Sequence, residues 1–199
     1  MTVMPRPANP EVRSRLLSVG RAVVHERGFN GAGVQDITAA ADVPKGSFYN
    51  YFDSKESFAA EILEEYWQSI EQRHGPILYD ARLKPLVRIR RFFKGLSQDH
   101  SEYGFALGCL IGNLSLELSN GSEETRAKLA DVLDRWEKAL GACLREAQER
   151  SELDVDTDPE QLAAIMIEAY EGAVMRGKVE QNGNAIERFE KVVLPRLIG

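Results

Sequence analysis

Apolar residues recur at three- and four-residue spacing along most of the chain, which is the period of an amphipathic α-helix. This spacing predicts a first helix over residues 10–28, with Gly28 as its stop signal. The apolar positions that share one face of this helix are Val12, Leu16, Val19 and Val23. The amino-terminal part of the chain is therefore expected to begin with one buried helical stripe.

The same pattern predicts two short helices over 34–41 and 45–51, and Ser54 then begins a long helix that should end near Gly75-Pro76. Glycine and asparagine residues separate the later segments. Further helices are expected at about 84–101, 105–119, 123–150, 159–181 and 184–197. The predicted fold is all-α, with about nine helices.

The two short helices are joined by a turn of three or four residues, the layout of a helix-turn-helix unit. The second lies in PKGSFYNYFDSKESF, where Phe48, Tyr49, Tyr51 and Phe52 are too close together for one helical face to bury all four. If this helix enters a DNA major groove, Lys45, Tyr49, Tyr51 and Lys55 reach phosphates or base edges, while the phenylalanines turn inward. The alternative, a helical corner in which every aromatic residue packs, stays open on spacing alone.

Charge is distributed unevenly along the 199 residues. Residues 1–55 carry a net charge of +2 and the remainder carries -8, within a total of -6. A mildly basic end on an acidic body is compatible with contact to a polyanion, although chance asymmetry between solvated faces explains it as well. Composition, at 43% hydrophobic and 28% charged, indicates a globular chain with a substantial core.

The remaining inventory argues against several classes of protein. Two cysteines are too few for a disulfide framework, and no signal peptide or membrane-spanning apolar run is present, so a cytoplasmic protein without membrane contact is expected. Three scattered histidines and the absence of zinc, phosphate-loop or hydrolase motifs predict no enzyme, no cofactor and no metal site.

The stretch GFNGAGVQDITAAADVPKGSFYNYFDSKESF resembles the amino-terminal signature of the TetR family of bacterial regulators. The resemblance implies a DNA-binding domain at 1–53, an effector-binding and dimerisation domain at 54–199, and a homodimer that represses transcription from a palindromic double-stranded operator. Pro44 replaces a more frequent serine, which removes a hydroxyl contact. The implied DNA-binding positions are Gln35, Pro44, Lys45, Gly46, Ser47, Tyr49, Asn50, Tyr51 and Lys55.

The last two long segments carry wide apolar stripes. In TetR-like proteins the last two helices commonly pair across a two-fold axis, which favours a dimer interface over burial in the chain's own core. The predicted interface residues are Leu162, Ile165, Met166, Ala169, Tyr170, Ala173, Ile186, Phe189 and Val193.

YGFALGCLIGNLSLELSN places Gly104, Gly108 and Gly112 four residues apart, which on a helix indicates close approach of a neighbouring backbone or a ligand. GCLIGN also resembles a subgroup of TetR-like repressors that respond to electrophiles, of the N-ethylmaleimide- or acrylate-responsive type. That resemblance implies a sensing thiol at Cys109.

A sensing thiol needs access and a nearby cation that lowers its pKa. The predicted cations are Lys178 and Arg176, and Cys143 is expected to be structural. Two alternatives stay open: an inert Cys109 beside a reversible small-molecule inducer, and a helical interaction module that binds no DNA. The effector, the operator sequence and the regulated genes are not encoded in any motif.

Overall fold

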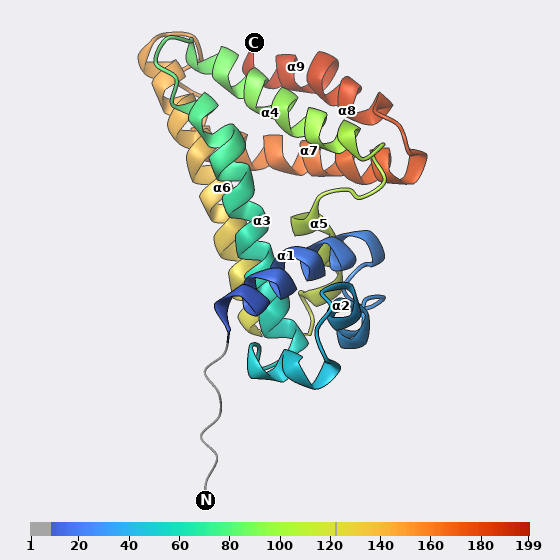
Figure 1. Ribbon diagram of the computed structural model, residues 1–199. Coiled ribbons are helices and arrows are strands. Elements are labelled where there is room, and N and C mark those ends of the chain that lie inside the picture. The colour runs from blue at the N-terminus through green and yellow to red at the C-terminus, as the bar shows by residue number, and fades with distance from the viewer. Residues whose placement is uncertain (1–8, 122) are drawn as a thin grey trace, which may run out of the picture. The chain divides into compact units, whose positions relative to one another are not determined.

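The computed structural model describes residues 9–121 and 123–199, so the first eight residues of the predicted 1–53 domain lie outside the described residues. Within these ranges the chain forms nine α-helices, one short 3-10 helix and one π-helical turn, with no strand (Figure 1). This confirms the predicted all-α fold. No helix in the described ranges is both long and apolar enough to cross a membrane.

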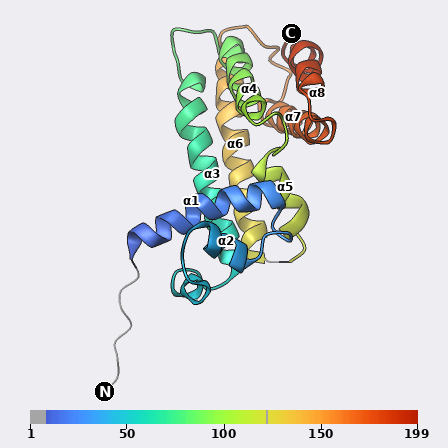
Figure 2. The same ribbon diagram turned by 45° about the vertical axis from the view of Figure 1, so that its right-hand side comes forward.

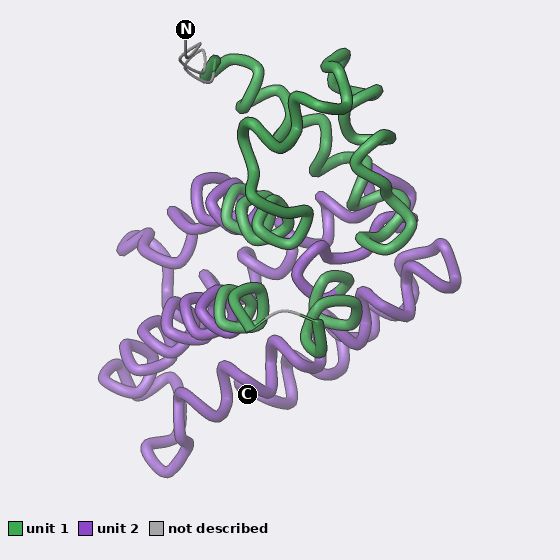
Figure 3. Tube along the Cα trace, turned by 90° about the horizontal axis from the view of Figure 1, so that it is seen from below, with its two compact units in different colours: residues 1–65, 113–129 green, residues 66–112, 130–199 purple. Residues whose placement is uncertain are grey.

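The chain divides into two compact units, shown in different colours in Figure 3. Unit 1 comprises residues 1–65 and 113–129, and unit 2 comprises residues 66–112 and 130–199. Three helices contribute residues to both units: α3 (Lys55–Leu78), α5 (Leu110–Leu118) and α6 (Glu123–Glu149). Each unit is therefore assembled from segments that are distant in the sequence.

Unit 1 begins with α1 (Pro10–Arg27), whose two ends follow the expected signals. The Asn9 side chain accepts a hydrogen bond from the Glu11 backbone N–H at 3.0 Å, and proline occupies the first helical position, where it loses no hydrogen bond. Gly28 ends the helix at φ 77°, a backbone conformation that glycine adopts without strain. The helix predicted over 10–28 is confirmed.

α1 packs on α2 (Val34–Ala40), and in Figure 2 it crosses the first part of α3. The packing is closest at Gly20, where an added Cβ would lie 2.6 Å from the Phe58 ring and 2.7 Å from Ile37. Both neighbours are fully buried. Gly20 is therefore the point at which three helices of unit 1 meet.

η1 (Lys45–Asn50), a 3-10 helix, follows α2, and α3 begins after Ser54 as predicted. The backbone N–H groups of Ser57 and Ser54 donate to each other's hydroxyl groups at 2.9 and 3.0 Å, which fixes the start of α3. The predicted end near Gly75-Pro76 is wrong, because α3 continues to Leu78 with Pro76 inside it. So close to the helix end, the proline costs only one hydrogen bond.

The core of unit 2 is aromatic. Phe93 in α4 (Pro85–Glu102), Tyr170 in α7 (Pro159–Glu180) and Phe189 have mutual ring-centroid distances of 5.0–5.3 Å. Arg88 on α4 is 2% exposed and donates to both carboxylate oxygens of Glu146 on α6, at 2.6 and 3.2 Å. This ion pair between a buried guanidinium and a partly exposed carboxylate joins α4 to α6.

Two further predicted helices differ from the structure. The segment predicted over 184–197 is divided into α8 (Asn184–Arg188), a π-helical turn η2 (Phe189–Val193) and α9 (Leu194–Ile198). Pro195 lacks an N–H and its ring conflicts with the carbonyl four residues earlier, which accounts for the widened turn before it.

The helix predicted over 105–119 is α5, which begins only at Leu110. Gly104, Phe105 and Gly108 have φ angles of 57°, 62° and 70°, which no right-handed helix accommodates. The idea that three glycines share one helical face is therefore wrong, since only Gly112 lies in the helix.

Candidate functional site

The aromatic residues of the segment 44–58 differ in how deeply they are buried. Phe48 and Phe52 are 0% and 3% exposed, whereas Tyr49 is 60% exposed. The rings of Phe48, Phe52 and Phe58 form a cluster with centroid distances of 5.0–5.4 Å. Phe48 and Phe52 thus anchor η1 to α3, and Tyr49 is left facing outward.

The predicted DNA-binding residues all lie in unit 1. Gln35 is exposed on α2, Tyr51 is half-buried at the end of η1, and an added Cβ at Gly46 would meet nothing within 4 Å. The remaining residues of η1 and its preceding cap form an exposed or half-buried row: Pro44, Lys45, Ser47, Tyr49 and Asn50. The structure thus brings residues of two short helices to open surface.

Lys55, also predicted to contact DNA, is already engaged within unit 1. Its ammonium donates to the Phe29 carbonyl and lies 4.1 Å from the centroid of the Phe29 ring. Partial burial lowers the pKa of Lys55. This lysine holds the loop after α1, so any DNA contact would have to compete with these interactions.

The same loop is held by Glu117, a residue that the sequence did not single out as functional. The backbone N–H groups of Phe29 and Asn30 donate to its two carboxylate oxygens at 3.1 and 2.7 Å. An added Cβ at Gly28 would lie 2.9 Å from Glu117 Oε1, so glycine is needed for this close approach as well as for its positive φ. The carboxyl end of α5 therefore clamps the loop between α1 and α2.

A second cluster surrounds Cys109 in unit 2. Cys109 precedes α5, is 5% exposed, and accepts a long hydrogen bond from the Tyr66 hydroxyl, with an O–S distance of 4.0 Å. The side chain of Glu171 on α7 is also hydrogen-bonded to the thiol. Burial and, secondly, the Glu171 carboxylate raise the pKa of Cys109 well above its ordinary value.

Glu171 is the unusual member of this cluster. Burial raises the pKa of its carboxyl to about 7. Its Oε1 atom is enclosed and has no hydrogen-bond partner among the described residues. An added Cβ at Gly112 would lie 2.5 Å from its Oε2 atom, so Gly112 leaves the space that the carboxyl group occupies. The close neighbour that the sequence indicated at this glycine is a carboxyl group.

The predicted cation beside Cys109 needs correction. Arg176 is exposed and pairs with Glu180 at 2.7 Å, and Lys178 is half-buried on the same helix. The neighbours that change the pKa of Cys109 raise it on balance, opposite to the direction expected for an activated thiol. Cys143 is buried and donates to the Pro85 carbonyl at 3.3 Å, and burial raises its pKa to about 11.

Two family models match the chain. "Bacterial regulatory proteins, tetR family" matches residues 16–62, and "Tetracyclin repressor-like, C-terminal domain" matches residues 85–193. The chain is 38% identical over 191 residues to the HTH-type transcriptional repressor DhaR of Mycobacterium sp. (strain GP1), covering 96% of this chain and 94% of that one. The chain belongs to the TetR family. The prediction of a DNA-binding transcription regulator that is not an enzyme is thereby confirmed.

Solved TetR-family structures agree with this assignment. The regulatory protein TetR from Rhodobacter sphaeroides superposes with a TM-score of 0.87 at 34% identity, covering 94% of this chain and 99% of that one. The reduced form of Escherichia coli NemR superposes with a TM-score of 0.85 at 28% identity, covering 95% and 97%. The similarity therefore extends over both units.

The predicted dimer residues of this TetR-family chain divide into two groups. Ile165 and Val193 are 46% and 37% exposed. Ala169 and Ala173 are both half-buried. The others belong to the core of unit 2 and offer no surface to a second chain: Leu162, Met166, Tyr170, Ile186 and Phe189. Met175 and Val179 are exposed apolar residues of the same helical region that the sequence missed, and Val192, on the predicted second stripe, is exposed as well.

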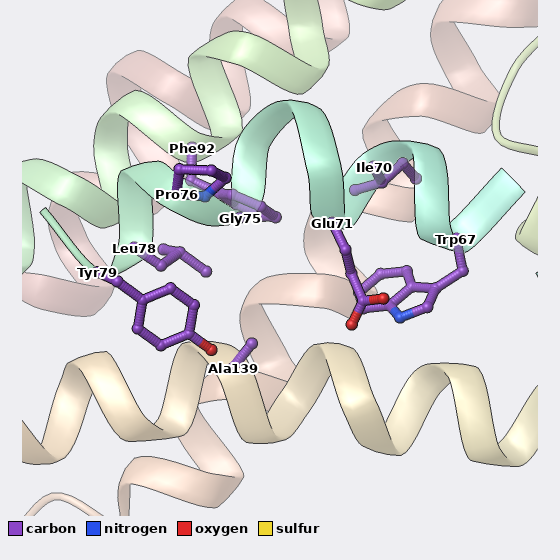
Figure 4. A pocket seen from close by; sticks show the side chains of 9 residues that line it. All are labelled: Trp67, Ile70, Glu71, Gly75, Pro76, Leu78, Tyr79, Phe92 and Ala139. Atoms are coloured by element: carbon purple, nitrogen blue, oxygen red, sulfur yellow. The ribbon is translucent and has the colours of Figure 1, made fainter.

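Unit 2 of this TetR-family chain also contains a pocket of about 260 Å³ (Figure 4). Figure 4 shows Trp67, Glu71 and Tyr79 extending from the α3 side of the pocket toward α6. The Trp67 indole N–H is buried and has no hydrogen-bond partner among the described residues. The lining is thus mainly apolar, and its polar groups are the Glu71 carboxylate, the Tyr79 hydroxyl and the Trp67 indole N–H. No group of three metal-ligating side chains occurs in the described ranges.

Proposed function

We propose that this TetR-family chain is a transcriptional repressor that binds a palindromic operator as a homodimer and is released by a small effector acting on unit 2. The observation that carries the proposal is the division of aromatic residues in η1. Phe48 fixes the helix to the core, and Tyr49 projects outward beside exposed Lys45. A short helix that is anchored by Phe48 and exposes Tyr49 and Lys45 is suited to enter a DNA major groove.

The proposed domain division is DNA binding at 1–53 and effector binding with dimerisation at 54–199. The separate matches to an amino-terminal and a carboxyl-terminal family model support it. DhaR is named a repressor, which supports repression as the sign of regulation.

The dimer contact is proposed on the exposed face of α7 and η2. Ile165, Met175 and Val179 lie within an arc of about 80° around α7, at 100° per residue, so they share one side of the helix. Val192 and Val193 add exposed apolar surface on η2. An apolar face of this kind suits an isologous contact about a two-fold axis.

The proposed effector is an electrophile that modifies Cys109. The solved NemR relative is described in a reduced form, which supports thiol chemistry in a similar protein. In this chain, Cys109 lies directly before α5, the helix whose other end carries Glu117. A bond formed at the sulfur would thus act on a helix that continues into unit 1.

A second candidate is a reversible inducer with an inert Cys109. The raised pKa of Cys109 and the apolar pocket beside Trp67 and Phe92 favour it. Such an inducer would be small and mainly apolar, because the pocket volume is about 260 Å³ and its polar groups are few.

The proposed DNA interface is tested by fluorescence anisotropy with duplex DNA from upstream of the gene. Tyr49→Ala should weaken operator binding by about 1–3 kcal/mol, because it removes a side chain that reaches the groove. Tyr103→Ala is the matched control, since Tyr103 is 62% exposed in unit 2 and Tyr49 is 60% exposed. Wild-type affinity in Tyr49→Ala would show that η1 is not the recognition helix.

A further inference from the structure

The surroundings of Cys109 pose a chemical problem for the proposed reaction. The thiolate is the nucleophile in additions to electrophiles, yet burial and Glu171 raise the pKa of Cys109 well above its ordinary value. Thiolate is therefore scarce at neutral pH. If Cys109 reacts at a useful rate, its proton has to leave within the cluster as the new bond forms.

Glu171 is placed to take that proton. Its side chain is hydrogen-bonded to the thiol, and the absence of a side chain at Gly112 admits the carboxyl group to this position. Oε1 is buried without a hydrogen-bond partner among the described residues, an arrangement that costs stability and that a role in proton transfer would explain. An enclosed acceptor beside an enclosed thiol is the geometry of a general base and its nucleophile.

We infer that Glu171 is the proton acceptor for Cys109 when an uncharged, α,β-unsaturated electrophile adds to the sulfur, an inference that rests on the proposed sensing role of Cys109. The Cys109 sulfur forms a bond to the β-carbon as the S–H proton moves to the Glu171 carboxylate. The π electron pair shifts toward the carbonyl group of the reagent. Glu171 then returns the proton to the α-carbon, so the product is a neutral thioether and the carboxylate is restored.

The groups that face Glu171 fit this role. The titratable groups that couple to it are Cys109, Tyr66 on α3 and the adjacent Tyr170, and the pKa values of all three are raised well above their ordinary values. All three are therefore neutral near pH 7. Glu171, with a pKa of about 7, is the member of this set that exchanges a proton in that range.

The same carboxyl group restricts the class of electrophile. An anionic reagent would have to approach a carboxylate whose Oε1 atom is enclosed, and two negative charges close together are unfavourable there. A neutral reagent meets no such repulsion. Because Cys109 is only 5% exposed, the reagent also has to be small.

The test is the rate of adduct formation by N-ethylmaleimide, followed by intact mass spectrometry on the full chain between pH 5.5 and 9. All proteins carry Cys143→Ser, so that Cys109 is the only thiol. The parent rate should rise through about pH 7, as Glu171 ionises, and then level off. Glu171→Gln should react at least about tenfold more slowly at pH 7.5 and lose the step near pH 7.

Two further variants make the result specific. Glu168→Gln changes an exposed carboxylate on the same helix and should react like the parent. Gly112→Ala keeps every titratable group but displaces the Glu171 carboxyl group, and it should also react more slowly. Operator binding before treatment checks that each variant is folded.

Two outcomes are separable. If Glu171→Gln reacts as fast as the parent or faster, Glu171 only suppresses the thiolate and the inference is overturned while the sensing role survives. If the parent forms no adduct, or forms one without leaving the operator, the proposed sensing role itself fails.

Discussion

At the scale of single residues, the spacing of aromatic residues indicated the candidate site better than the distribution of charge did. Four crowded aromatic residues indicated that some had to face outward, and the structure buries Phe48 and Phe52 while exposing Tyr49. Glu171 could not be found in this way, because nothing in its local sequence shows that it packs against Cys109. A carboxylate's partner across the fold is set by tertiary packing and leaves no local periodicity.

The raised pKa of Glu171 predicts how stability depends on pH. A carboxyl group whose pKa is about 7 in the folded state and 4.5 as a model value binds its proton more tightly when folded. The folded state therefore loses stability as pH rises from about 4.5 to 7, by roughly 3 kcal/mol in all. Glu171→Gln removes this titration.

We expect the free energy of unfolding of Glu171→Gln, measured by urea denaturation, to exceed that of wild type at pH 8.5. The gain should be much smaller at pH 5. Glu168→Gln, which changes an exposed residue of the same helix, should follow wild type at both values. An equal difference between Glu171→Gln and wild type at both pH values would contradict the assigned burial.

At the scale of elements, helix existence was predictable, whereas helix ends were predictable only where a capping signal marked them. α1 and the start of α3 have strong capping signals at Asn9 and Ser54, and both begin where the sequence indicated. α5 was predicted to begin five residues too early, because apolar spacing continues through residues whose φ angles are positive. Periodicity reports which residues are apolar, whereas a helix end depends on backbone angles.

α5 also carries the contact that the sequence missed, the clamp of Glu117 on the loop after α1. Glu117→Gln keeps one acceptor oxygen but places an NH₂ group against the second backbone donor. We expect it to lower the free energy of unfolding by about 1–3 kcal/mol. Hydrogen exchange should also accelerate at the amides of Phe29 and Asn30, while the exposed-site control Glu124→Gln should change neither quantity. Unchanged exchange at those two amides would show that the clamp is not formed in solution.

At the scale of the whole molecule, the resemblance predicted a dimer contact on the last two helical segments, and only part of the predicted residues are exposed. Most of the predicted residues serve the core of unit 2, because an apolar stripe alone does not distinguish a core face from a partner face. The exposed apolar residues Met175 and Val179 now define the proposed contact.

Val179→Glu should therefore convert the dimer into a monomer, because it places a charge on each side of a two-fold contact. Val155→Glu is the matched control, since Val155 is 78% exposed in the segment before α7 and Val179 is 81% exposed. Light scattering coupled to size-exclusion chromatography gives the molar mass. A dimer that persists in Val179→Glu would place the contact elsewhere.

The central claim is that a reaction at Cys109 releases a TetR-family regulator from its operator. The most direct measurement is the anisotropy of labelled upstream DNA bound to wild type, Cys109→Ser and Cys143→Ser, before and after N-ethylmaleimide. We predict that all three bind at first, that the reagent releases wild type and Cys143→Ser, and that Cys109→Ser stays bound. Release of Cys109→Ser at the wild-type rate, or retention of wild type on the DNA, would contradict the claim.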